Sequence, residues 1–163
     1  MIISVADLTA KCKDLLMHAD VPELAAARTA ETLVSADARG ISSHGVIRLA
    51  RYIDCMKSGG IKPDAEIQII DEGPAFIRAS AAGGLGIPAS YEVTERLIAK
   101  AASMPLAAAT VNHSDHYGAA GFYAMKCAEA GLIGFSMSNT CPLIAVSGAA
   151  SAGIGDGFPI VTD

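Results

Sequence analysis

Three side chains capable of acid–base and anion-binding chemistry recur at helical spacing early in the chain. His44, Arg48 and Tyr52 stand at positions i, i+4 and i+8, and residues at this spacing share one face of a helix. An imidazole can move a proton near neutral pH, a guanidinium can hold a carboxylate through two parallel hydrogen bonds, and a phenol can orient a hydroxyl or carbonyl group. The spacing alone favours an ordinary exposed helix surface, because helical spacing often produces such coincidences.

The residues around this motif predict where its helix begins and which side is buried. The hydroxyl of Ser43 can cap a helix N-terminus, and Gly59 can end the helix, which predicts a helix over 43–58. Because a helix N-terminus disfavours the imidazolium form, we expect His44 to be neutral and able to accept a proton. The residues expected to face the core of this helix are Val46, Leu49, Ile53 and Met56.

The remaining elements predict an α/β protein. Helices are expected over 4–18 and 22–39, with Leu15 and Leu24 among their inward-facing residues. The later elements alternate between strands and helices: strands over 66–71 and 75–79, a helix from 86 to about 104, a buried strand over 106–111, a helix over 118–130 and a buried strand over 132–137. This order predicts a helical domain over 1–62, followed by a mixed-sheet α/β domain over 63–163.

A polar segment over 112–118 follows the predicted strand at 106–111, where α/β sheets place ligand chemistry. One of His113 and His116 is expected to be catalytic and the other structural, and Asp115 could orient an imidazole. The two histidines could also bind zinc, but spacing identifies no third ligand, so no metal site is predicted.

Two further segments could bind a cofactor or simply form turns. The segment 138–142 offers hydroxyl and amide groups that suit a cofactor amide or sugar, and it also suits an ordinary strand-ending turn. The glycines of Gly84-x-Gly86-x-x-Ala89 satisfy a loose dinucleotide-loop template. Pro88 interrupts that template and the next strand lacks an acidic end, so turn geometry is the favoured interpretation.

Composition narrows the range of partners. The chain has 163 residues with a net charge of -5 and no cluster of Lys and Arg, which favours a small-molecule ligand over nucleic acid or an anionic membrane. No apolar run is long enough to span a membrane. Four scattered cysteines and the lack of a signal-peptide pattern predict reduced thiols and a cytoplasmic protein.

Several of these motifs, in this order and spacing, closely resemble one known family. They are Ser-Ser-His-Gly-x-x-Arg-Leu-x-x-Tyr at 42–52 and the segments at 83–86, 114–118 and 131–139. The resemblance is to the malate/L-lactate dehydrogenase family of non-Rossmann nicotinamide oxidoreductases, which also contains ureidoglycolate, sulfolactate and diketogulonate enzymes. It implies hydride transfer between NAD or NADP and a small 2-hydroxy or 2-oxo acid, in a homodimer. It also implies that the helical domain 1–62 lies on the substrate side and that 63–163 form a partial, truncated, non-Rossmann nicotinamide-cofactor-binding domain.

The resemblance also implies roles for individual residues. His44 and His116 correspond to histidines assigned as acid/base in different family members, so either could transfer the proton. Arg48 would bind the substrate carboxylate, and Ser43 and Tyr52 would line the pocket. Thr140, Asn139 and Asp163 would contact the cofactor.

The sequence departs from the family near its last residues. Family members are about twice as long and carry a Gly-Thr-Asn-Pro loop that has no clear counterpart between Gly148 and Asp163. Two functions therefore follow from the sequence. The chain is a dehydrogenase that is complete only with further polypeptide, or it is an inactive remnant or partner subunit of such an enzyme.

Overall fold

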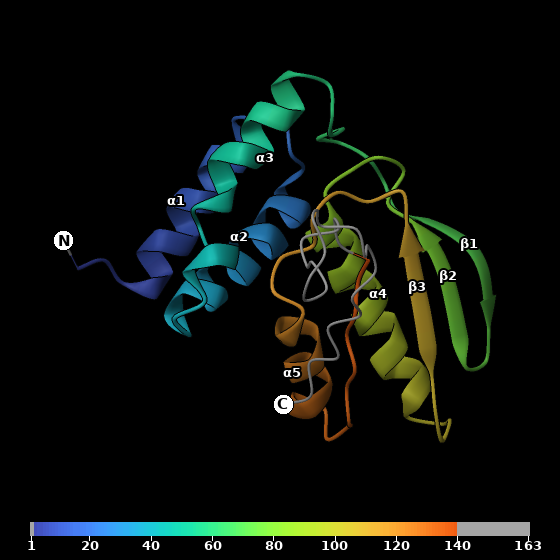
Figure 1. Ribbon diagram of the computed structural model, residues 1–163. Coiled ribbons are helices and arrows are strands. Elements are labelled where there is room, and N and C mark those ends of the chain that lie inside the picture. Colours follow the sequence, from blue (N-terminus) through green and yellow to red (C-terminus); the bar gives the residue numbers. More distant parts are fainter. Residues whose placement is uncertain (1, 140–163) are drawn as a thin grey trace, which may run out of the picture.

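A computed structural model of the chain describes residues 2–139 (Figure 1). The elements, in chain order, are α1 (Val5–Met17), α2 (Glu23–Ala38), the 3₁₀ helix η1 (Ser42–His44), α3 (Arg48–Lys57), β1 (Gln68–Gly73), β2 (Phe76–Ser80), α4 (Gly86–Ala101), β3 (Ala108–Asn112) and α5 (Gly121–Glu129). The first three α-helices lie on one side and the sheet on the other, with α4 between α2 and the sheet (Figure 1). The predicted order of helices and strands is confirmed as far as α5.

The first two helices begin where capping chemistry predicts. The Ser4 hydroxyl accepts a hydrogen bond from the Asp7 backbone N–H at 3.0 Å and so caps α1. Pro22 directly precedes α2, as expected of a residue without an N–H. Leu16 and Leu33 are fully buried, but Leu15 and Leu24 are 53% and 63% exposed, so their predicted inward orientation is wrong.

The third helix begins at Arg48 and not at Ser43, which corrects the predicted span of 43–58. The cause is a tertiary contact, because the Asp37 carboxylate accepts a hydrogen bond from the Val46 backbone N–H at 2.8 Å. Gly45 packs directly against that carboxylate in an extended conformation, which interrupts the helical backbone. His44 therefore lies at the end of the short 3₁₀ helix η1.

The sheet is mixed. β1 pairs with β2 in an antiparallel hairpin, and β2 pairs with β3 in parallel. Two residues, Pro74 and Ala75, connect β1 to β2, so the turn lies slightly later than predicted. β3 is only half-buried, with alternate residues exposed, and the expectation of a fully buried strand there is wrong.

The predicted buried strand over 132–137 is also not observed: this segment carries only a single bridge residue, Ser136. Ile133 and Phe135 are 89% and 63% exposed, and exposure alternates with a period of two along the segment. An apolar run does not reveal which of its faces is covered, and here the larger side chains point outward.

One hydrophobic cluster joins the two halves of the described chain. Leu85 and Ile87, at the start of α4, pack with buried residues of α1, α2 and α3. The division into domains at residue 62 stays a prediction. Within residues 2–139, every helix is too short or too polar to cross a membrane.

Candidate active site

Side chains from the two predicted motifs meet in one cluster. The rings of His44 and His116 stack with centroids 5.4 Å apart and planes inclined by 28°. The hydroxyl of Tyr52 lies 2.6 Å from Nδ1 of His116, although 64 positions separate these residues in the chain. The structure thus brings together residues that the spacing analysis left in separate segments.

Glycines hold the loop that carries His116. Gly83 has φ +84° and donates its backbone N–H to the carbonyl of His113 at 2.8 Å. Gly86 serves another purpose, because a Cβ at that position would overlap the backbone carbonyl of Asp115. The positive φ belongs to Gly83, which lies outside the Gly84-x-Gly86 template. Gly86 permits the His116 loop to lie directly on the first turn of α4.

Tyr52 lies in the core and contacts His116 through its hydroxyl and through its ring, whose centroid lies 5.9 Å from that of the imidazole. Its side chain is fully buried between Leu49 and Met56, on the apolar side of α3. Burial, together with the nearby Asp115 carboxylate, raises the pKa of Tyr52, so its hydroxyl stays protonated at neutral pH. Its positions three residues after Leu49 and four before Met56 are the sequence signal of this burial.

The two arginines of α3 differ in their contacts. Arg48 donates from Nε to the backbone carbonyl of Ser43 at 2.5 Å, and its two terminal nitrogens have no partner among the described residues. Arg51 pairs with the Asp115 carboxylate at 3.1 Å. The same carboxylate accepts from the backbone N–H of His116 at 2.6 Å, so Asp115 fixes the loop backbone and does not contact the imidazole. The motif spacing did not single out Arg51, although it lies three residues after Arg48 on the same helix.

Both histidines are neutral at pH 7. Burial lowers the pKa of His116 to about 4, and the charges of Arg48, His44 and Arg51 add to this effect while Asp115 opposes it. Burial and the charge of Arg48 lower the pKa of His44. The expected neutrality of His44 is thus supported, but the expected cause, a helix N-terminus, is wrong.

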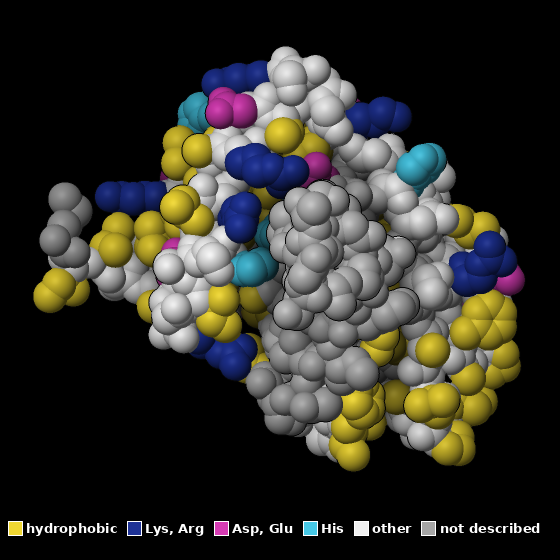
Figure 2. All heavy atoms as spheres, viewed as in Figure 1, with side chains coloured by type: hydrophobic (Ala, Val, Ile, Leu, Met, Phe, Trp, Pro, Cys, Tyr) yellow, Lys and Arg dark blue, Asp and Glu magenta, His cyan; other side chains and the backbone are white. Residues whose placement is uncertain are grey.

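Of the other predicted site residues, Ser43 lies in the cluster and Asn139 forms no side-chain contact with it. The Ser43 hydroxyl contacts Nδ1 of His44 at 2.9 Å. Asn139 is exposed, and its side chain has no partner within residues 2–139. Thr140 and Asp163 lie outside the described residues. On the face shown in Figure 2, histidine and basic side chains lie together over the helical part of the molecule.

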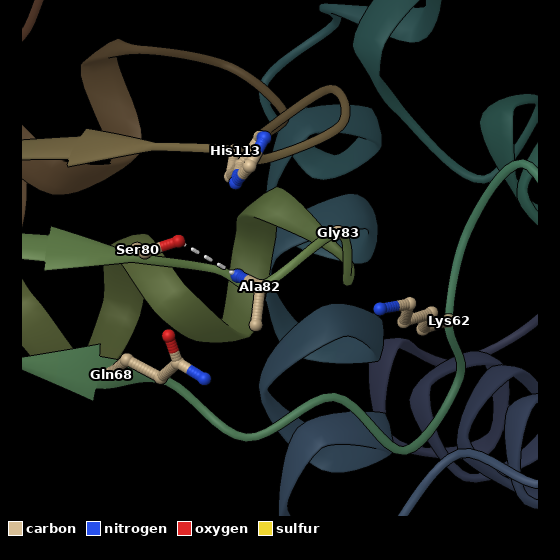
Figure 3. Close-up of a pocket in the computed structure, with 6 residues that line it drawn as sticks. All are labelled: Lys62, Gln68, Ser80, Ala82, Gly83 and His113. Atoms are coloured by element: carbon tan, nitrogen blue, oxygen red, sulfur yellow. Dashed lines mark hydrogen bonds between the residues drawn. The ribbon is translucent and has the colours of Figure 1, made fainter.

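His113 takes no part in the cluster and lines a separate open pocket of about 340 Å³ (Figure 3). Lys62, Gln68 and His113 point toward this pocket from three sides, while Ser80 accepts a hydrogen bond from the Ala82 backbone N–H at 3.1 Å. The described part of the chain contains no group of three His, Cys, Asp or Glu side chains arranged to hold a metal ion.

Comparison with known proteins shows that the chain is similar to dehydrogenases of hydroxy acids. The family model for malate/L-lactate dehydrogenase matches residues 3–160. The chain is 42% identical over 134 residues to a malate dehydrogenase of Pyrococcus abyssi, covering 82% of this chain and 37% of that protein. It is 34% identical over 135 residues to an L-sulfolactate dehydrogenase of Methanocaldococcus jannaschii, covering 83% of this chain and 39% of that protein. A ureidoglycolate dehydrogenase (NAD(+)) of Escherichia coli K12 is 32% identical over 150 residues, covering 92% and 43%.

The structural match agrees with the sequence match. The solved malate dehydrogenase of Pyrococcus horikoshii superimposes with a TM-score of 0.85 and 39% identity, over 89% of this chain and 42% of that one. The chain therefore spans about two fifths of the length of the relatives that it matches. With a family model over nearly its whole length and the same fold over most of it, the chain belongs to the malate/L-lactate dehydrogenase family.

Proposed function

We propose that this chain forms the substrate side of an NAD(P)-dependent dehydrogenase that acts on a small 2-hydroxy or 2-oxo acid. The observation that carries the proposal is the cluster of two neutral imidazoles beside an arginine. His44 and His116 stack against each other, and the terminal nitrogens of Arg48 have no partner among the described residues. This combination can bind an acid and move a proton at the neighbouring oxygen.

Arg48 is the proposed carboxylate-binding residue. Its Nε is held by the Ser43 carbonyl, which fixes the guanidinium and leaves the two terminal nitrogens to form parallel hydrogen bonds with a carboxylate. Held in this way, the acid presents its hydroxyl or keto oxygen to the imidazole pair. A fixed orientation of this kind lowers the entropic part of the activation barrier.

The nicotinamide cofactor, NAD or NADP, would exchange a hydride with the carbon that bears this oxygen. Asn139 is the one predicted cofactor residue among those described, and its exposed side-chain amide is available for hydrogen bonding. Ser138 and Asn139 offer uncharged hydroxyl and amide groups, which suit a carboxamide or a sugar hydroxyl. A homodimer and a cytoplasmic location are further parts of this proposal, on the basis of the family resemblance.

The test is a titration of the purified chain with the reduced cofactor, followed by its fluorescence, with a screen of 2-oxo acids for oxidation of the cofactor. Saturable binding together with turnover of one acid supports the proposal. Binding without turnover of any acid would favour a partner subunit without catalysis. A folded chain that neither binds cofactor nor turns over acid, even when a polypeptide supplying the rest of the family fold is added, would overturn it.

Arg48 variants test the proposed carboxylate contact. In the active assembly, Arg48→Ala is expected to raise KM about 100-fold or more, because a charge-assisted hydrogen bond contributes about 1.5–3 kcal/mol and this residue offers two. Arg48→Lys keeps the charge without the planar pair of donors and should restore only part of the affinity. Equal KM values for Ala, Lys and the parent protein would exclude Arg48 as the carboxylate ligand.

A further inference from the structure

One nitrogen of His116 accepts a hydrogen bond whose direction is fixed. The backbone N–H of Gly118 donates to Nδ1 at 3.2 Å, and the Tyr52 hydroxyl lies 2.6 Å from the same atom. A backbone N–H can only donate, so Nδ1 presents its lone pair. A neutral imidazole with a bare Nδ1 carries its proton on Nε2.

The two histidines are therefore not equivalent. In the neutral His116, Nε2 already holds a proton, so it can donate a hydrogen bond but cannot accept a proton there. Within the described part of the chain, Nδ1 of His44 has one hydrogen-bond partner, the Ser43 hydroxyl at 2.9 Å. A hydroxyl can donate or accept, so His44 is free to adopt either tautomer and to gain or lose a proton.

We propose that Tyr52 and the Gly118 N–H hold His116 as the Nε2–H tautomer, so that His116 donates a hydrogen bond to the substrate oxygen while His44 transfers the proton. Tyr52 is a positioning residue in this scheme, since its side chain is fully buried and its hydroxyl contacts Nδ1 of His116. The tautomer depends only on the hydrogen bonds above. The assignment of roles rests on the proposed dehydrogenase function.

Oxidation of the acid removes one proton and one hydride from it. During oxidation of the acid, the hydroxyl proton passes to His44, a hydride leaves the same carbon for the oxidised nicotinamide, and the carbon–oxygen bond becomes double. The imidazolium of His44 then releases its proton to solvent. Throughout, Nε2–H of His116 donates to the oxygen and stabilises the negative charge that develops there.

The charges around His116 favour this division of roles. Arg48 and Arg51 of α3 and His44 of η1 all disfavour an added positive charge on His116. Among residues 2–139, the carboxylate that favours one is Asp115 of the same loop. Protonation of Nδ1 would also break the Gly118 hydrogen bond. The Tyr52 hydroxyl could reverse its direction, but the backbone N–H could not.

Long-range ¹H–¹⁵N correlation spectra of the ¹⁵N-histidine-labelled 163-residue protein would read the tautomer directly. We expect His116, identified by its absence in His116→Gln, to show a protonated Nε2 and a bare Nδ1 at pH 7. Tyr52→Phe should shift the Nδ1 resonance of His116, because one of its two donors is lost. Tyr91→Phe is the matched control, since it removes another buried tyrosine hydroxyl, one that donates to Glu31, and should leave His116 unchanged.

A His116 with its proton on Nδ1, or an imidazolium at pH 7, would overturn the inference whatever the enzyme activity. In the active assembly, His44→Gln should abolish the ionisation seen in the pH profile of kcat/KM. His116→Gln should keep that ionisation, because its amide can still donate a hydrogen bond. His116→Leu should lower kcat by about 100-fold or more, and His116→Gln should lower it less. If the spectra agree and no acid is turned over, the tautomer stands and the dehydrogenase proposal fails.

Discussion

The neutral His116 should make the folded chain sensitive to mild acid. Its pKa lies near 4 in the folded state, against an ordinary value of 6.5. Between these two values the unfolded chain binds more protons at this residue than the folded chain does. The free energy of unfolding should therefore rise with pH across this window and fall as the pH is lowered from about 6.5 to about 4.

The size of this effect follows from the same two values. A pKa difference of one unit corresponds to 1.36 kcal/mol, which gives about 3.4 kcal/mol for complete protonation. His116 is only half-buried, so solvent screening reduces the expected loss to ~1–2 kcal/mol. Burial is the main cause, and the arginine charges of α3 add to it.

Urea unfolding of the parent protein and of His116→Gln at pH 7.0 and 4.5 measures this loss. Carboxylate protonation affects both proteins alike, so the difference between their pH dependences isolates His116. His18→Gln, which removes an exposed histidine at the end of α1, is the matched control for the substitution itself. An identical loss of stability in the parent and in His116→Gln would refute the assignment of His116 as a neutral, partly buried imidazole.

Two further predictions concern packing. Gly86→Ala should destabilise the chain by ~1–3 kcal/mol and shift the His116 resonances, because the added Cβ meets the backbone carbonyl of Asp115. Gly60→Ala, which has room for a Cβ, should lack the shift in the same spectra. Leu33→Ala should cost ~2–5 kcal/mol in urea unfolding, since this side chain is fully buried. Leu24→Ala on the same helix, 63% exposed, should cost less than ~0.5 kcal/mol, and equal costs would contradict the burial described for α2.

Local chemistry was sufficient to locate α1 and α2 in the sequence. Ser4 and Pro22 mark their N-termini by mechanisms that act within one turn. The start of α3 could not be found in this way, because it depends on a carboxylate nine residues away, Asp37, that binds the Val46 N–H. A contact of this kind belongs to the tertiary structure and leaves no local sequence pattern.

The candidate site was only partly predictable, for a similar reason. The residue types at His44, Arg48 and His116 indicated acid–base chemistry, and the family resemblance placed them in one site. Spacing alone could not show that the two histidines stack, nor that the Tyr52 ring belongs to the core. The sequence located the three strands of the sheet approximately. It could not predict which side chains of 132–137 are exposed, because that depends on which neighbours cover each face.

The hydrogen bond between Tyr52 and His116 closes a loop of 64 residues, which contains β1, β2, α4 and β3. The entropic cost of such a closure is met only when α2 and α4 are already docked, which the ion pairs of Arg28 with Glu92 and Glu95 help to secure. The two imidazoles should thus come together late in folding and separate early in unfolding. On heating, the His44–His116 contact should be lost before the helical signal falls, which makes it a reporter of docking between the two halves.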